Sequence, residues 1–142
     1  MEIQDSFGYV LNINAKLIKR RLDTAIKKYD ITTAQWSLLK LLSVVNNLTQ
    51  VEIANRLHSD IVTVGLVIER LVKKEMVQKA HLENDRRAYR ISITDRGRKI
   101  TDIIEEEANK CNKAALQGFT EKEMETLMLL LNKVTENLMK EN

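Results

Sequence analysis

The stretch from Leu48 to Gly97 constrains the possible folds most, because its hydrophobic pattern changes from helical to alternating along its length. Thr49 and Glu52 have the spacing of a capping box, in which each side chain satisfies a backbone N–H group of the first helical turn. A helix is therefore expected from about Gln50. Its apolar face is expected to hold Val51, Ile53, Ala54 and Leu57.

A second helix is expected after residues 58–60, where Ser59 or Asp60 can cap it. Two helices joined by so short a connection must cross each other. The core side of the second helix repeats at spacings of three and four through Val64, Val67, Ile68, Leu71 and Val72. The opposite face would meet the major groove of DNA, which admits a helix. The residues of the two helices expected at DNA are Gln50, Ile61, Val62, Thr63, Gly65, Leu66, Arg70 and Lys73.

A β-hairpin is predicted after the second helix, because residues 77–82 and 88–93 alternate while residues 83–87 are rich in turn formers. Arg86 and Arg87 would lie at its tip, and arginines on a narrow ribbon suit the electronegative minor groove. The predicted fold class is mainly α with a small β-wing, arranged as a winged helix-turn-helix.

These residues resemble the MarR/SlyA family of bacterial transcription regulators. The resemblance rests on LTQVEIANRL, on RLVKKEMV, on the triplet Asp85-Arg86-Arg87, on ISITDRG, and on ITTAQWSLLKLL upstream. By motif position it implies that Arg87 reaches the minor groove, that Asp85 orients it, and that Arg86 lies close enough for phosphate.

The resemblance also implies a homodimer that responds to a small phenolic or otherwise aromatic effector. In the family such effectors bind in a crevice between the dimer helices and the DNA-binding lobe. Asn14, Ile18 and Trp36 are candidates to line it, although helix packing explains each of them, and an ordinary core position is favoured for Trp36.

The sequence departs from the family pattern in two places. Val62, Gly65 and Leu66 stand where relatives often carry Ser, Thr or Arg, so we expect an A·T-rich site read by methyl contacts, groove shape and the wing. Glu75 stands where relatives usually carry glycine, so strain is expected in the turn into the wing.

Helices are predicted on both sides of the winged segment. One covers Val10 to Ala25 and a second follows Thr32 or Thr33; after the wing, Thr94 caps a third, Gly118 ends it, and Thr120 with Glu123 forms a capping box for the last. Residues 1–31 and 95–142 are interpreted as a helical dimerisation region, and residues 32–94 as the DNA-binding lobe. The apolar face expected to point inward from the last helix consists of Met124, Leu127, Met128, Leu131, Val134 and Leu138.

Leu129 and Leu130 widen that apolar face beyond what one neighbour needs, which favours coverage by another subunit. Charge also divides along the chain of 142 residues: residues 1–45 hold seven basic and four acidic side chains, residues 46–100 eleven and seven, and residues 101–142 five and nine. A basic centre with an acidic C-terminal arm is typical of a polyanion-binding module, with ordinary surface variation as the alternative.

Other classes of protein find little support in the sequence. No apolar run is long enough for a transmembrane helix and the N-terminus does not look like a signal peptide, so the cytoplasm is expected. We expect no enzyme, cofactor or metal site, because no phosphate loop, nucleophile elbow or ligand cluster occurs, and Glu105-Glu106-Glu107 fits a solvated helix face. The single Cys111 is expected to be a buried thiol rather than a redox sensor.

Two functions follow from this sequence. The first is a dimeric, ligand-responsive repressor that binds pseudo-palindromic double-stranded DNA. The second is a helical dimer that uses Ile61, Val62 and Leu66 for protein–protein contact and whose DNA binding is weak or vestigial.

Overall fold

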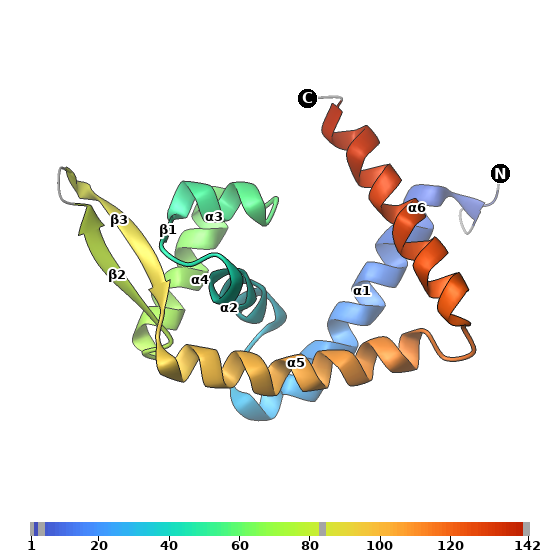
Figure 1. Ribbon diagram of the computed structural model, residues 1–142, viewed down its shortest axis with the longest axis horizontal. Helices are drawn as coiled ribbons and strands as arrows, with labels where there is room; N and C mark the ends of the chain where they lie inside the picture. Colours follow the sequence, from blue (N-terminus) through green and yellow to red (C-terminus); the bar gives the residue numbers. More distant parts are fainter. Residues whose placement is uncertain (1, 3–4, 83–84, 141–142) are drawn as a thin grey trace.

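The computed structural model describes residues 2, 5–82 and 85–140, with the side chains at 82 and 85–87 outside that description. A lobe formed by α2 to β3 lies at one end, and an arm formed by α1, α5 and α6 reaches to the other, where the N-terminus lies (Figure 1). The elements in chain order are α1 (Phe7–Ile26), a 3-10 turn η2 (Lys27–Tyr29), α2 (Thr33–Val44), β1 (Leu48–Thr49), α3 (Gln50–Arg56), α4 (Ile61–Lys73), β2 (Val77–Leu82), β3 (Asp85–Ile93), α5 (Asp95–Ala115) and α6 (Glu121–Lys140). The predicted winged helix-turn-helix fold is confirmed.

The predicted helix starts are confirmed by their caps. Thr49 and Glu52 form a complete capping box at α3, and Asp60 rather than Ser59 caps α4. Thr94 caps α5 through the Gly97 amide, at 3.1 Å. Short-range side-chain chemistry therefore sets where these helices begin.

The wing differs from the predicted two-stranded hairpin. The two residues of β1 pair antiparallel with β3, which gives a three-stranded sheet in the order β1-β3-β2. A strand this short has no alternation that the sequence could reveal. The second wing strand also begins at Asp85 instead of Ala88, so the predicted five-residue turn is wrong.

One apolar core joins the lobe to α1 and α5. Val64, Ile68 and Leu71 of α4 are buried as predicted, and Leu22 and Ile26 bring α1 into the same core. The remaining core residues that are almost fully excluded from solvent are Leu38, Leu39, Leu42, Ile53, Ile91 and Ile104. The prediction for Val51 is wrong, since its side chain is 53% exposed.

The last helix extends away from this core. None of the described residues of α6 is buried: Met124, Leu127, Leu131 and Val134 are half-buried, while Met128 and Leu138 are exposed. The expected inward orientation of Met128 and Leu138 is therefore wrong for a single chain. In Figure 1 the helix starts at the end of α5 that is far from the lobe and rises away from α5, so a single chain offers it little surface to pack against.

Glu75 adopts the left-handed backbone conformation at the turn between α4 and β2, with φ 60°. Among the described residues, the other non-glycine residues with positive φ are Asp30, Asn47 and His58, which belong to residue types that tolerate this region. A glutamate does not belong to them, so the strain expected at this position from the sequence has a geometric basis.

Replacing Glu75 by glycine is expected to stabilise the fold slightly. Relief of about 1–2 kcal/mol of left-handed strain is partly offset by about 0.5–1 kcal/mol of glycine backbone entropy. The net gain in the free energy of unfolding is on the order of 0.5 kcal/mol, measurable by urea denaturation. Asn47→Gly is the matched control and should give a smaller gain, because asparagine already tolerates its φ of 58°. Equal gains from both variants would contradict the strain argument.

Candidate nucleic-acid interface

The N-terminus of α4 is held rigidly by Asp60. Its Oδ1 accepts a hydrogen bond from the Thr63 amide at 2.8 Å, and its Oδ2 accepts one from the Thr63 hydroxyl at 2.7 Å. The side-chain and backbone hydrogen bonds from Thr63 hold the pKa of the Asp60 carboxyl below its ordinary value. Because the Thr63 hydroxyl already donates to Asp60, it retains only acceptor capacity toward a base.

The outward face of α4 is apolar and accessible at its first turns. Val62 is 70% exposed, Leu66 60% and Ile61 46%. These side chains have no hydrogen-bonding groups, so toward DNA they can make only apolar contacts, for which the thymine methyl groups of the major groove are the natural partners.

Gly65 does not form part of the open face that the sequence predicted. It is half-buried, and a Cβ there would lie 2.7 Å from Nε2 of Gln50. That same Nε2 donates to the Ile61 carbonyl at 2.7 Å, which ties the start of α3 to the start of α4. Gly65 therefore makes room for Gln50, and Gln50 uses one of its two amide hydrogens within the protein.

The last turn of α4 is basic. Arg70 and Lys73 are exposed, and within the described residues neither has a carboxylate within the 4.0 Å of an ion pair. The nearby Glu69 is paired with Lys79 of β2, and that hydrogen bond lowers the pKa of its carboxyl. Both cations are thus available for the phosphate contact predicted for them.

The base of the wing is fixed by residues for which the sequence predicts no role. Arg90 donates from Nη1 to the Asn47 carbonyl at 2.8 Å and lies 3.9 Å from Oε1 of Glu52. Lys79 lies 5.3 Å from the centroid of the Tyr89 ring. These contacts join segments that are distant in sequence, so no local pattern could have indicated them.

The wing-tip predictions concern side chains outside the described part of the structure. The backbone of Asp85, Arg86 and Arg87 belongs to β3. Their predicted roles at the minor groove remain predictions.

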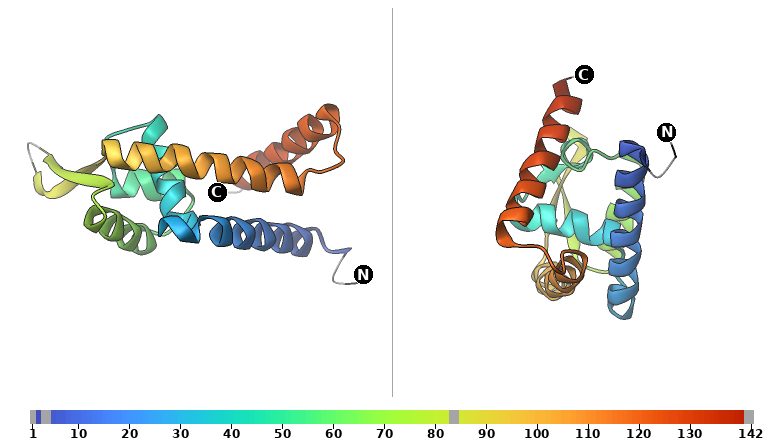
Figure 2. Two further views of the ribbon diagram at one scale, coloured as in Figure 1. Left: turned by 90° about the horizontal axis from the view of Figure 1, so that it is seen from below. Right: turned by 90° about the vertical axis from the view of Figure 1, so that its right-hand side faces the viewer.

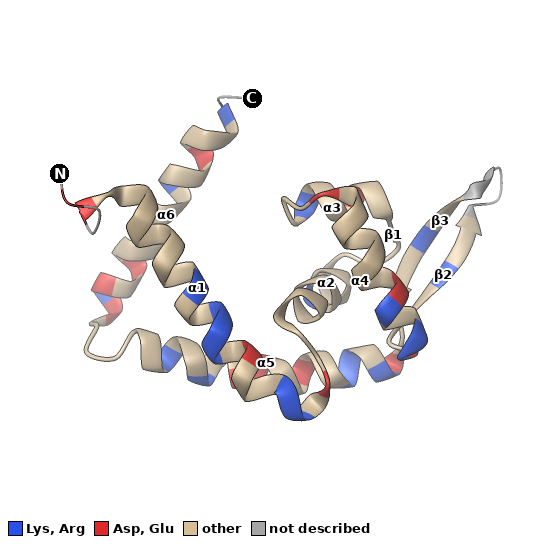
Figure 3. Cartoon of the chain, turned by 180° about the vertical axis from the view of Figure 1, so that it is seen from behind, with Lys and Arg blue, Asp and Glu red and all other residues tan. Residues whose placement is uncertain are grey.

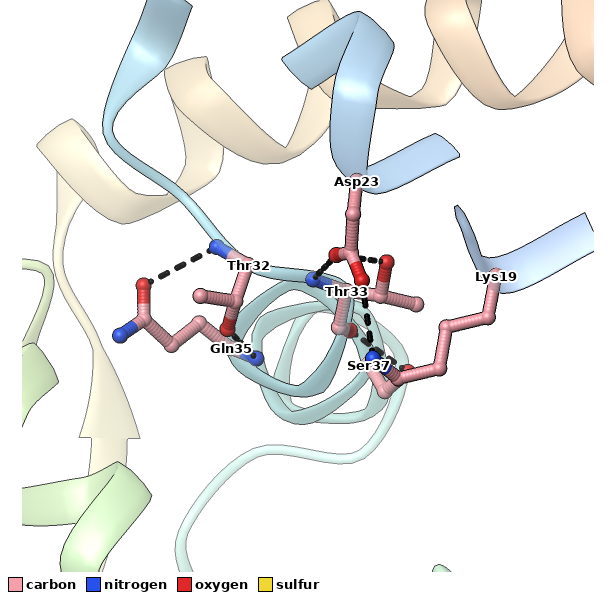
Figure 4. Close-up of polar contacts among 6 residues, drawn as sticks. All are labelled: Lys19, Asp23, Thr32, Thr33, Gln35 and Ser37. Carbon is pink, nitrogen blue, oxygen red and sulfur yellow. Dashed lines mark hydrogen bonds and ion pairs between the residues drawn. The ribbon is translucent and has the colours of Figure 1, made fainter. Parts of the chain in front are cut away.

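A polar cluster connects α1 to the lobe (Figure 4). Asp23 of α1 accepts hydrogen bonds from the amide of Thr33 at 2.8 Å, from the Thr33 hydroxyl, and from Lys19 Nζ at 2.8 Å. Burial alone would raise the pKa of the Asp23 carboxyl, but the hydrogen bonds from Lys19 and Thr33 outweigh it and hold the pKa below its ordinary value. The cluster sets the position of α1 against the start of α2.

The residues predicted to bind an effector do not all meet. Asn14 and Ile18 line a groove of about 800 Å³ between α1, α5 and α6, which also contains the buried Cys111. Trp36 is half-buried and is not among the lining residues, and its buried Nε1 has no acceptor within the described residues. The burial predicted for Cys111 is confirmed.

Two further features are absent from the part of the chain that the structure describes: a metal-binding cluster and a membrane-spanning helix. No group of three or more His, Cys, Asp or Glu side chains there could hold a metal ion. No described helix is both long and apolar enough to cross a membrane.

Comparison with known proteins gives this geometry a context. A model of the MarR family matches residues 31–89, which cover most of the lobe. The uncharacterised HTH-type transcriptional regulator YybA of Bacillus subtilis (strain 168) is 27% identical over 126 residues, covering 86% of this chain and 84% of YybA.

Two solved structures share the whole fold. A MarR protein from Peptoclostridium difficile DA00132 superposes with a TM-score of 0.87 at 25% identity, covering 99% of this chain and 94% of that one. A mutant of MarR from E. coli, complexed with operator DNA, superposes with a TM-score of 0.82 at 26% identity, covering 89% of this chain and 91% of that one. Residues 31–89 therefore match the MarR family, and the chain is similar in sequence to an HTH-type transcriptional regulator and in fold to MarR proteins of known structure.

Proposed function

We propose that this protein is a homodimeric repressor that binds a pseudo-palindromic site in double-stranded DNA and responds to a small aromatic effector. The observation that carries the proposal is the outward face of α4, where a rigid capped N-terminus, an exposed apolar surface and the cations Arg70 and Lys73 follow one another. Such a face combines base contact with phosphate contact. The E. coli relative bound to operator DNA supports the same use of this lobe. Acting on chromosomal DNA, the protein would work in the cytoplasm.

The arm supports the dimer. The groove between α1, α5 and α6 is mainly apolar, and exposed hydrophobic side chains continue from it along α6. An apolar surface of this extent marks an interaction site, and a second copy of the arm supplies the matching chemistry. The exposed side chains concerned are Phe7, Val10, Leu17, Phe119, Met128, Leu129, Leu130, Leu138 and Met139.

A twofold dimer would place two α4 helices about 34 Å apart, one turn of the duplex, which matches a pseudo-palindrome. We would measure the mass in solution by light scattering and the affinity for duplexes selected from a random DNA pool by fluorescence anisotropy. A dimeric mass and an enriched A·T-rich palindrome support the proposal. A monomer at micromolar concentration, or a failure to enrich any sequence, would contradict it.

Removing the Arg87 side chain is expected to weaken specific binding by about 1–3 kcal/mol, because its predicted contact is with the minor groove. The measurement is the affinity for the selected duplex at physiological salt. Lys122→Ala removes an exposed charge on α6 and serves as the control. An affinity unchanged by Arg87→Ala would remove this role.

The effector would bind in the groove of the arm. Asn14 and Ile18 lie together there, so a ligand would contact the proposed dimer interface. It would release DNA only if it bound more tightly to the arrangement of the two lobes that does not fit DNA. Screening small phenols and aromatic acids in the anisotropy assay tests this, and Ile18→Trp, which fills the groove, should abolish a genuine response.

One observation favours a second function. Val62 and Leu66 expose enough apolar surface for a protein partner, and the chain would then be a helical dimer with vestigial DNA binding. The two functions predict different results for charged substitutions at Leu66.

A further inference from the structure

Helix α1 and the first two residues of η2 carry a large excess of positive charge, which the candidate interface on α4 and the wing does not explain. Residues 7–28 contain six Lys or Arg side chains and one Asp, an excess of five positive charges, whereas the whole chain has a net charge of only +3. The rest of the protein is therefore net negative. Positive charge is therefore concentrated on a segment, α1 with the start of η2, that lies outside the helix-turn-helix and the wing.

Four of these cations gather on one face of α1 and its continuation into η2. They line a shallow hollow of about 430 Å³ together with Asp23 and Thr24. We call this set the α1 basic stripe, and it consists of Lys16, Lys19, Arg20 and Lys27.

The other faces of α1 are used differently. Leu22 and Ile26 enter the core, while Asn14 and Ile18 line the apolar groove. The stripe therefore occupies the face that remains exposed after α1 has packed.

The positive charges of the stripe are not balanced by neighbouring carboxylates. Its one carboxylate, Asp23, is engaged with Thr33 and Lys19, as Figure 4 shows. Within the described residues, Lys16, Arg20 and Lys27 have no carboxylate within 4.0 Å. Lys16 and Arg20 are also like charges at i and i+4, a spacing that destabilises a helix. An external anion would relieve this repulsion.

The location of α1 indicates that this anion is the DNA backbone, because α1 and α4 lie on the same side of the molecule. In both views of Figure 2, α1 (blue) lies along the same side of the molecule as α4 (green), with α5 and α6 on the opposite side. Figure 3 looks at this side, and there the Lys and Arg positions of α1 and of the end of α4 are both in view. Because α4 buries Val64, Ile68 and Leu71 inward, its DNA-facing surface points out on this side.

The proposed dimer extends this geometry. Its twofold axis would pass near the apolar arm, so α1 lies between the axis and α4. A duplex that reaches both α4 helices must cross the axis and pass α1 on the way. We infer that the α1 basic stripe is a second phosphate-binding surface, which contacts the DNA backbone between the two half-sites. This inference rests on the proposed function.

The test combines a triple variant with a matched control. Lys16→Gln, Arg20→Gln and Lys27→Gln remove three charges of the stripe and spare Lys19, which holds Asp23. Lys113→Gln, Lys122→Gln and Lys133→Gln remove three exposed charges from α5 and α6. Both triples change the net charge equally, so only position distinguishes them.

Each phosphate contact contributes about 0.9 to the slope of log affinity against log salt. The stripe variant should reduce the slope by up to about 5 per dimer and weaken binding roughly tenfold or more at physiological salt. The preference for the selected over a scrambled duplex should remain, because phosphate contacts carry no sequence information. The control triple should leave the slope nearly unchanged. Equal slopes for the stripe variant and the unmodified protein, or equal effects of both triples, would overturn the inference.

A second experiment locates the contact. Methylphosphonates that neutralise the phosphates between the half-sites should weaken binding by the unmodified protein and have little effect on the stripe variant. Equal weakening of both proteins would overturn the inference while leaving the proposed function intact. The absence of any salt-dependent DNA binding by the unmodified protein would instead refute the proposed function, and the inference with it.

Discussion

Replacing Gly97 by alanine is expected to destabilise the protein by about 3 kcal/mol, near the upper end of the range for overpacked sites. A Cβ at this position would lie 2.2 Å from the Met76 carbonyl oxygen and 2.8 Å from Cγ1 of Ile93. The carbonyl cannot yield easily, because it accepts the Thr94 amide at 3.0 Å beside the cap of α5. The start of α5 would have to move away from the base of the wing.

The measurement is thermal unfolding at fixed protein concentration, where we expect the midpoint to fall by about 10 °C. Gly8→Ala is the control, since Gly8 lies in a helix and a Cβ there would meet no atom within 4 Å. Alanine there should stabilise by about 0.5–1 kcal/mol. If the two variants behaved alike, close packing at Gly97 would not be the reason for glycine.

The sequence predicted the parts of the fold that local chemistry decides. The cap at Thr49 and the core repeat through Val64, Ile68 and Leu71 each lie within a few residues, and the structure confirms both. It also indicated that α6 presents more apolar surface than one neighbour needs, and Leu129 and Leu130 are indeed exposed.

The parts that could not be predicted depend on contacts between distant segments. β1 exists only because Leu48 pairs with Ile91. A helical-wheel projection correctly places Gly65 on the outward side of α4, but the side chain of Gln50 from the preceding helix covers it.

The α1 basic stripe illustrates a different limit. Its lysines and arginine look like the solvated side of an amphipathic helix when only the sequence is considered. That these residues line one hollow, on a helix that lies on the same side of the molecule as α4, becomes clear only when the helices are placed in space.

Two substitutions of Leu66 should separate the candidate functions, because each function predicts a different order of effects. Leu66 is 60% exposed on α4, so a charged side chain at this position leaves the core intact. Leu66→Glu brings a carboxylate toward the phosphates, and like charges at an interface cost several kcal/mol. We expect DNA affinity to fall by about a hundredfold or more, which corresponds to about 3 kcal/mol.

Leu66→Lys removes the same apolar surface but adds a charge that attracts DNA. If α4 binds DNA, this variant should retain affinity for a scrambled duplex, or gain some, while losing part of its preference for the selected site. If the exposed face of α4 instead serves an apolar protein contact, lysine and glutamate should be equally damaging to that contact, and neither should change DNA binding. Anisotropy titrations of both variants, with unfolding curves to confirm intact folding, therefore decide between the functions: a large difference between Glu and Lys requires a polyanion opposite Leu66, and no difference excludes one.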